Sequence, residues 1–282
     1  MRIDVEHLTT YSYSDPVTLA PQTVRLRPRP DGSFRELSYR LLVDPAPALR
    51  TEMLDAAGNL VTRLWFEGET RELRIVSRFT VQTLIPAAYG LLVDSAQRRL
   101  PVSYPSQEQA LLTPYLGDGR THPAVAALVE GLAARSQDNP LDFLILLTDW
   151  LYRGITREIR EQGEPQTPAE TLERGRGACR DQTMLFVAAA RAMGIAARFV
   201  SGYQDRSAMD TPERHLHAWP ECYIPGCGWR GFDPTRGIPV TNRHVPVAAA
   251  PVQAGAMPVE GSYFGAATSR LGYDVRIRTD DA

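Results

Sequence analysis

The chain contains 282 residues, of which 43% are hydrophobic, and it carries a formal net charge of −2. This length and apolar content predict a globular protein with a substantial buried core, organised as one large or two ordinary domains. Acidic and basic side chains are interspersed and leave no broad cationic field, which argues against nucleic acid or an anionic membrane as a partner.

Residues 1–85 show the period-two alternation that is typical of half-buried β-strands. The first strand alternates from Ile3 to Tyr13, and three later runs repeat the pattern at 37–43, 60–66 and 73–81. The stretch DAAGN at 55–59 indicates a hairpin turn, because Gly and Asn tolerate a positive φ. We therefore expect an antiparallel β-sandwich here, with a structural or substrate-presenting role.

Residues 86–121 lose this periodicity and gather Pro, Gly and Ser, which predicts an irregular linker or strap. Helical spacing of apolar residues begins at Pro123, and proline suits the first turn of a helix. A second helix is predicted to start at Asn139–Pro140, and apolar residues on most of its circumference indicate that it is buried. The capping-box pattern TPAE at 167–170 predicts the start of a third helix.

Cys179 lies at the predicted start of a fourth helix, within GRGACRDQTMLF at 175–186. Gly175 and Gly177 interrupt the chain before this helix, and Gly194 suits the position just after it. Unpaired N–H groups at a helix N-terminus favour thiolate, and they can also donate to an oxyanion on a carbonyl that the sulfur attacks. Taken alone, however, a lone cysteine is more often a small buried apolar residue.

His217 and Asp233 are predicted to lie on neighbouring strands. A strand is expected over 195–203, and after a polar loop the stretch HLHAWPECYIP places alternate residues on one strand face. A PGCG turn then leads into a second strand that ends at Asp233. A nucleophilic thiolate needs a base, and the base needs an acceptor that orients its second ring nitrogen. This hairpin supplies both residue types.

Three separated motifs resemble the transglutaminase-like superfamily of cysteine enzymes. These motifs are GRGACRDQ at the helix start, HAW at 217–219 and GFDPT at 231–235. The resemblance implies that Cys179 is the nucleophile, His217 the general base and Asp233 the carboxylate that orients the base. The stretches YSYSDPV, LRPRP and DAAGN and the tail PVEGSYFG are similar to a bacterial subgroup with an N-terminal β domain.

The expected fold is α+β, with the antiparallel sandwich followed by a papain-like, transglutaminase-like core of helices packed on an antiparallel sheet. The expected boundaries are 1–85 for the sandwich, 86–121 for the strap, 122–240 for the core and 241–282 for a C-terminal segment returning to the sheet. The expected reaction is cysteine-dependent acyl chemistry on peptide or side-chain amides, with hydrolysis favoured over amine transfer. A protein or peptide substrate is expected, and neither a cofactor nor a metal.

The N-terminal sequence and the cysteine count bear on the compartment. Charges at Arg2, Asp4 and Glu6 leave no apolar segment of the kind found in signal peptides or membrane spans. Three cysteines, at 179, 222 and 227, are too few and too unevenly spaced for a disulfide framework. We therefore expect a cytoplasmic protein.

Three alternative functions stay open. A true protein-glutamine gamma-glutamyltransferase would pass the acyl group to an amine, and a noncatalytic binding module would keep the fold without turnover. A zinc site could use His215, His217, Cys222 and Cys227, which are ligand types that zinc accepts. Strand alternation argues against zinc, because it places Cys222 on the opposite face from both histidines.

Several neighbours of the three motif residues carry their own expectations. Asp181 is expected to complement the helix dipole in the first turn, and Trp219 to be part of the core. Pro220 cannot donate a ladder hydrogen bond, which predicts an edge strand or a bulge. No partner is assigned to the remaining histidines His7, His122 and His244.

Overall fold

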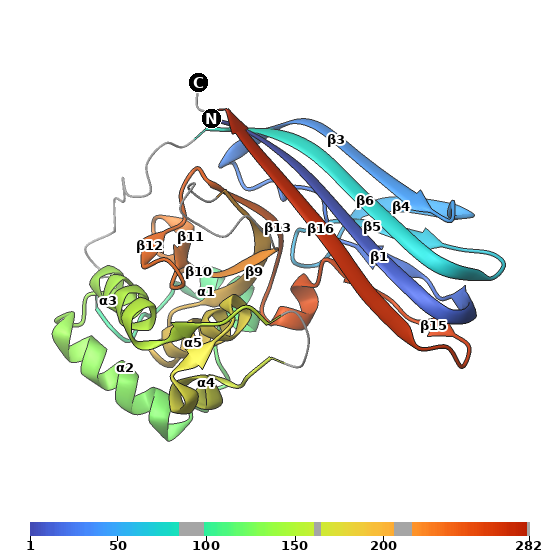
Figure 1. Cartoon of the computed structure of the whole chain (residues 1–282). Coiled ribbons are helices and arrows are strands. Elements are labelled where there is room, and N and C mark those ends of the chain that lie inside the picture. Colours follow the sequence, from blue (N-terminus) through green and yellow to red (C-terminus); the bar gives the residue numbers. More distant parts are fainter. Residues whose placement is uncertain (85–98, 161–164, 206–215, 281–282) are drawn as a thin grey trace.

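The computed structural model describes residues 1–84, 99–160, 165–205 and 216–280. It shows an all-β part beside a core of helices and a second group of strands (Figure 1). The predicted α+β class is therefore confirmed. Within the described ranges, no helix is both long and apolar enough to cross a bilayer.

The all-β part is a sandwich of two antiparallel sheets. One sheet has the strand order β15-β1-β6-β3 with β16 also paired to β1, and the other has the order β14-β2-β5-β4. The strands are β1 (Arg2–Leu19), β2 (Gln22–Val24), β3 (Phe34–Asp44), β4 (Leu49–Leu54), β5 (Leu60–Trp65), β6 (Thr70–Thr83), β14 (Val259–Glu260), β15 (Tyr263–Phe264) and β16 (Ser269–Asp280). Alternate β1 residues from Ile3 to Thr9 are buried, as their period-two pattern predicts.

The predicted DAAGN turn joins β4 to β5. The Asp55 side chain accepts hydrogen bonds from the backbone N–H groups of Ala57 and Asn59, each at 2.9 Å. Gly58 has φ +77°, a conformation that costs glycine little. The turn is thus fixed by its own sequence.

The core contains five α-helices and two short 3-10 turns within the described residues. They are α1 (Ser106–Leu112), η2 (Thr113–Tyr115), α2 (Pro123–Arg135), α3 (Pro140–Gly154), α4 (Pro168–Arg174), α5 (Cys179–Ala192) and η3 (Gln253–Ala256). The predicted starts of α2, α3 and α4 are confirmed by caps at His122, Asn139 and Thr167, the last in a full capping box. Gly194 follows α5 with φ +70°, as predicted.

The segment predicted as an irregular strap, 86–121, is more ordered than expected. Residues 85–98 lie outside the described residues, but α1 and η2 occupy part of the remainder. The Tyr104 hydroxyl donates to the Tyr223 carbonyl at 2.8 Å and accepts from the Ala196 N–H at 3.0 Å. Tertiary hydrogen bonds of this kind have no local sequence pattern, so the segment resembled a plain linker.

The core sheet has the strand order β12-β11-β10-β9-β13 and is antiparallel. The strands are β9 (Ala197–Gln204), β10 (His217–Ile224), β11 (Gly228–Asp233), β12 (Ile238–Pro239) and β13 (His244–Ala250), and a separate parallel pair is formed by β7 (Thr156–Arg157) and β8 (Arg176–Gly177). The large buried cluster of the helices includes Cys222 and Phe232 from this sheet. The helices therefore cover one of its faces.

Pro220 lies in the central strand, so the prediction of an edge strand was wrong. β10 pairs with β9 from His217 to Cys222, whereas its pairing with β11 begins only at Glu221. Pro220 thus occupies the part of β10 that has a ladder on one side only. The missing N–H can be tolerated there because no second ladder has begun.

The C-terminal residues serve both parts of the molecule. β13 is part of the core sheet, whereas β16 pairs with β1 from Arg2 through Tyr13. Figure 1 shows β16 running alongside β1 over most of its length. The predicted segment 241–282 is therefore divided between the core sheet and both sheets of the sandwich.

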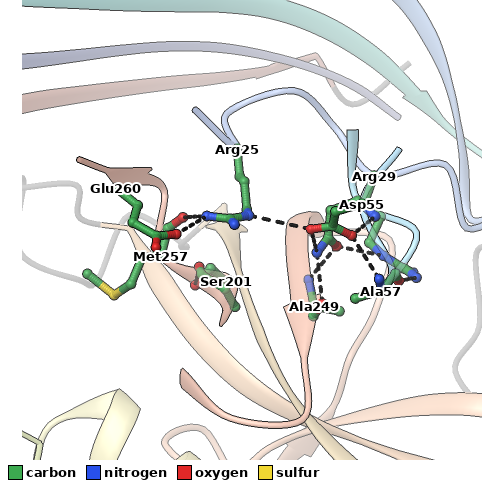
Figure 2. Close-up of polar contacts among 10 residues, drawn as sticks. Arg25, Arg29, Asp55, Ala57, Ser201, Ala249, Met257 and Glu260 are labelled. Atoms are coloured by element: carbon green, nitrogen blue, oxygen red, sulfur yellow. Dashed lines mark hydrogen bonds and ion pairs between the residues drawn. The ribbon is translucent and has the colours of Figure 1, made fainter. Parts of the chain in front are cut away.

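The sandwich and the core share a buried interface. Ile3 and Phe79 of the sandwich pack in one cluster with Tyr203, Val245 and Val247 of the core. Asn59 at the DAAGN turn bonds to both the N–H and the carbonyl of Ala249 in β13, and Figure 2 shows this turn against Ala249. Apolar packing and the hydrogen bonds of the Asn59 side chain to the Ala249 backbone together fix the position of the sandwich on the core.

Candidate active site

Cys179 is the first residue of α5, as the sequence predicts. Its thiol is half-buried, and α5 packs against β10 and β9 of the core sheet. Gly177 precedes it in a confined space, because an added Cβ would lie 3.0 Å from the Asp181 Cβ and 3.2 Å from Thr171 Cγ2. The chain before α5 is therefore closely packed against Asp181 and Thr171, and Cys179 follows it at the helix N-terminus.

Asp181 holds the start of α5 in place and is fully buried. Its carboxylate accepts from the N–H groups of Ala178 at 2.8 Å and Gln166 at 2.9 Å, and it forms an ion pair with Arg160 at 2.8 Å. The expectation of a residue that merely complements the helix dipole was therefore incomplete. This carboxylate connects α5 to the segment before α4.

The structure brings His217 and Asp233 together with Cys179. His217 begins β10 and Asp233 ends β11, and the antiparallel hairpin places these two strand ends side by side. His217 Nε2 lies 2.8 Å from Asp233 Oδ2, and the His217 side chain also hydrogen-bonds the Cys179 thiol. All three residues singled out from the sequence thus form one connected group.

The charges of this group favour a thiolate and an imidazolium. Burial raises the pKa of the Cys179 thiol, but the hydrogen bond and charge of His217, with the Ala218 N–H, outweigh it and lower the pKa below its ordinary value. Burial lowers the pKa of His217, but Asp233 and Cys179 outweigh it and raise the pKa to about 9. Burial also opposes ionisation of Asp233, whose pKa is nonetheless held well below its usual range by His217 and His244.

Sequence reasoning missed most of the groups that hold Asp233. Its Oδ2 also accepts from Gln204 Nε2 at 3.1 Å and faces His244 Nε2 at 3.2 Å, while its Oδ1 accepts from the N–H and hydroxyl of Thr235. An Asp followed two residues later by Thr is a local turn pattern, so Thr235 could have been found from the sequence. Gln204 and His244 reach Asp233 through sheet pairing, which leaves no such local signal.

His244 is held as one neutral tautomer. Its Nδ1 accepts a hydrogen bond from the Thr241 N–H at 3.1 Å, so the proton lies on Nε2 and is donated to Asp233. Burial lowers the pKa of His244 more than Asp233 raises it. Asp233 therefore faces one charged and one neutral imidazole.

The other residues weighed from the sequence take structural positions. Trp219 is fully buried in a small core cluster, and its ring centroid lies 6.0 Å from that of His217. His215 lies outside the described residues. Cys222 is buried in the helix-covered cluster, on the side of β10 away from Trp219. Among the residues that the structure describes, no three His, Cys, Asp or Glu side chains form a group that could hold a metal ion.

Two family models match the chain. The Bacterial transglutaminase-like N-terminal region matches residues 3–82, and the Transglutaminase-like superfamily matches residues 127–234, which include all three site residues. Residues 127–234 thus match a transglutaminase-like core. The family match and the site geometry together support enzyme activity and cysteine-dependent acyl chemistry in general.

Sequence relatives and one solved structure match nearly the whole chain. An uncharacterized protein of Mycobacterium leprae is 26% identical over 98% of this chain and 98% of its own, and one of Mycobacterium bovis is 29% identical over 93% and 88%. A solved structure from Cytophaga hutchinsonii, described as a candidate cysteine protease, is 21% identical, with a TM-score of 0.73 over 100% of this chain and 92% of that chain. This structure shows that the two-part fold is shared.

Proposed function

We propose that this transglutaminase-like protein is a cysteine enzyme that hydrolyses amide bonds of a protein or peptide through a thioester acyl-enzyme. One observation carries the proposal, namely the hydrogen-bonded series from Cys179 through His217 to Asp233 at a helix N-terminus. It supplies a nucleophile, a proton carrier and an orienting carboxylate.

The acylation half of the reaction follows from this arrangement. The Cys179 thiolate attacks the amide carbonyl carbon, and the electron pair of the C=O bond moves to oxygen. The oxyanion is favoured by the N-terminal N–H groups and the dipole of α5. As the tetrahedral intermediate collapses, the C–N bond breaks and the His217 imidazolium gives its proton to the leaving nitrogen. The products are a thioester on Cys179, a free amine and a neutral His217.

Deacylation reverses the roles with water as the nucleophile. Neutral His217 takes a proton from water, the resulting hydroxyl attacks the thioester carbonyl, and the thiolate leaves as the carboxylic acid forms. Asp233 stays ionised throughout and stabilises the imidazolium that returns. The thiolate and imidazolium are thereby restored for the next cycle.

The charges around Cys179 support hydrolysis rather than transfer to a lysine. Among the described residues, Arg157, Arg180 and Glu158 line the cavity at Cys179, and a third cation of the lining, Arg160, is paired with the buried Asp181. A lysine ammonium approaching this group meets like charge, which disfavours it, whereas neutral water is unaffected. Most of the polar loop that precedes His217 in the sequence, at 206–215, lies outside the described residues.

A partition experiment tests this proposal. A turning-over amide substrate is mixed with increasing primary amine, and the free acid and the amide product are separated and counted. We expect free acid to predominate, with no turnover by Cys179→Ala and normal turnover by the control Cys227→Ala. Predominant amide product would instead establish a true transglutaminase, and absence of turnover on broad peptide and amide panels would favour a noncatalytic module.

A further inference from the structure

A cavity of about 240 Å³ lies beside Cys179 and is shared by the sandwich and the core. Its lining includes the two residues that would react, Cys179 and His217. The sandwich supplies residues of β1, β16 and β14, and the core supplies residues of β9 and β10 and of the segment 253–258. A substrate held at the sulfur therefore contacts both parts of the protein.

One wall of this cavity is a single face of the sandwich sheet. Tyr11 lies opposite Leu271 and Thr9 lies opposite Tyr273 in the antiparallel register of β1 and β16. Residues two apart on a strand share a face, so these four side chains form one cross-strand patch. Leu271 in this patch is 45% exposed.

A second wall is the segment from η3 to β14, and hydrogen bonds from both parts of the protein hold it. The Ser201 hydroxyl donates to the Ala256 carbonyl at 2.8 Å, and the Arg25 N–H donates to the Pro258 carbonyl at 2.7 Å. The Arg25 guanidinium also binds Glu260 at 3.0 Å, and Figure 2 shows it between Glu260 and Asp55. The wall that carries Met257 and Val259 is therefore fixed in place.

Apolar side chains dominate these two walls and the floor between them. The sandwich and the 253–259 segment contribute Leu271, Met257, Pro258 and Val259, and Phe199 of β9 adds a buried aromatic ring. Met257, like Leu271, is an exposed large hydrophobic residue, at 40%. Exposed apolar surface beside a nucleophile is stabilised when an apolar group covers it.

The charged residues of the lining lie on one side of the cavity. The charged residues come from 157–160 and from Arg180 in α5, on the side of the nucleophile's own helix. His7 on the sandwich wall is already hydrogen-bonded to the Tyr203 hydroxyl at 2.7 Å, and burial lowers its pKa to about 4, so it adds no charge at neutral pH. The sandwich side of the cavity is thus uncharged.

We propose that this cavity binds one bulky apolar side chain, of leucine or phenylalanine type, on the substrate residue next to the scissile amide. Sites for whole drug-sized ligands measure roughly 300–1,000 Å³, so this smaller cavity suits a single large side chain. The N-terminal sandwich is then a specificity element of the enzyme. This inference rests on the proposed hydrolysis at Cys179 and specifies its substrate.

Rates of Cys179 alkylation show whether the cavity prefers an apolar group, and they require no known substrate. Iodoacetamide and N-hexyl-iodoacetamide both form the same S–C bond with the thiolate and release iodide. Peptide mapping identifies which cysteine has been modified. Each rate is divided by the rate of the same reagent with glutathione. We expect the hexyl reagent to be favoured at Cys179 by at least about tenfold, because burial of about two methylenes supplies that factor.

Variants at Leu271 show whether the sandwich wall produces this preference. Leu271→Asn removes the apolar contact without adding charge and should lower the hexyl preference by about fivefold or more. The rate with iodoacetamide itself should stay within about twofold, because the substitution leaves the thiolate unchanged. Leu271→Met should restore the preference, and Leu49→Asn, at an exposed leucine outside the lining, should leave it at the wild-type value.

The outcomes separate the pocket from the chemistry. Equal normalised rates for the two reagents in the wild type, or an unchanged preference in Leu271→Asn, would overturn the pocket proposal even if amides are hydrolysed. A strong, Leu271-dependent preference together with no hydrolysis of any amide would instead keep the pocket and refute the hydrolase. With active enzyme, peptides that carry Leu or Phe beside the scissile bond should show lower KM than Gly or Asp peptides, and Leu271→Asn should reduce that difference.

Discussion

At the scale of single residues, the site depends on how Asp233 is surrounded. The carboxylate is fully buried, and it receives hydrogen bonds from His217, His244, Gln204 and Thr235. A buried carboxylate that accepts several hydrogen bonds beside an imidazolium remains ionised at a depressed pKa. Asp233 is therefore a fixed negative charge that keeps His217 protonated next to the sulfur.

Replacing Asp233 with Asn should change both the rate and the pH profile. His217 has its pKa raised to about 9, so the imidazolium form persists below that pH and is lost as the pH rises through it. In Asp233→Asn the raising charge is absent, so we expect the alkaline fall in kcat/KM to move to lower pH. The rate should also drop by about a hundredfold or more. An unshifted alkaline limb would show that Asp233 does not act on His217.

His244 should act through its hydrogen bond to Asp233 rather than through packing alone. His244→Leu keeps a side chain of useful size but removes the donor, whereas His244→Gln retains an N–H donor. We expect about a tenfold loss of kcat in the Leu variant, corresponding to one charge-assisted hydrogen bond, and a smaller loss in the Gln variant. Equal losses in the two variants would assign His244 to packing.

At the scale of secondary-structure elements, features that depend on residues close in sequence could be predicted, whereas features that depend on the order of strands in a sheet could not. The starts of α2, α3 and α4 follow from prolines and capping residues close in sequence, because the groups they satisfy lie within one turn. The start of α5 follows from the glycines that precede it. The same holds for Cys179 at its helix start. The central position of Pro220 and the contact of His244 with Asp233 depend on sheet order, which chain-local patterns do not encode.

The N-terminus of α5 should depend on the buried Asp181. Asp181→Ala leaves the Arg160 charge and two backbone N–H groups without this carboxylate, which should lower the free energy of unfolding by about 2–3 kcal/mol. Urea denaturation followed by circular dichroism measures the change. Asp149→Ala is the control, because its solvent-exposed ion pair with Arg153 should leave the free energy of unfolding nearly unchanged.

At the scale of the whole molecule, the two-sheet sandwich and the core form one folded unit. β16 returns to pair with β1, and the cluster around Tyr203 and Val245 joins the sandwich to the core sheet. The cavity at Cys179 exists only where these two parts meet. The shape of the cavity at Cys179 therefore depends on how the sandwich is placed on the core.

Tyr203→Phe should weaken the contact between the two parts. The hydroxyl is hydrogen-bonded to the buried His7, and removing it leaves that ring nitrogen without its partner, at a cost of about 1–2 kcal/mol. We expect a lower midpoint of thermal unfolding with a single transition retained. Coincident curves from near- and far-UV circular dichroism check this, and separate transitions would show that the sandwich and the core unfold independently.

The pairing of thiolate and imidazolium is tested most directly by the rate of Cys179 alkylation as a function of pH. Iodoacetamide reacts with thiolate, so the rate at Cys179 should already be high at about pH 6 to 7, well below the ordinary cysteine pKa of about 8.5. A second change near pH 9 should follow the loss of the His217 proton, and it should move to lower pH in Asp233→Asn. A single inflection near pH 8.5 at Cys179, unaltered by Asp233→Asn, would contradict the ion pair and with it the proposed mechanism.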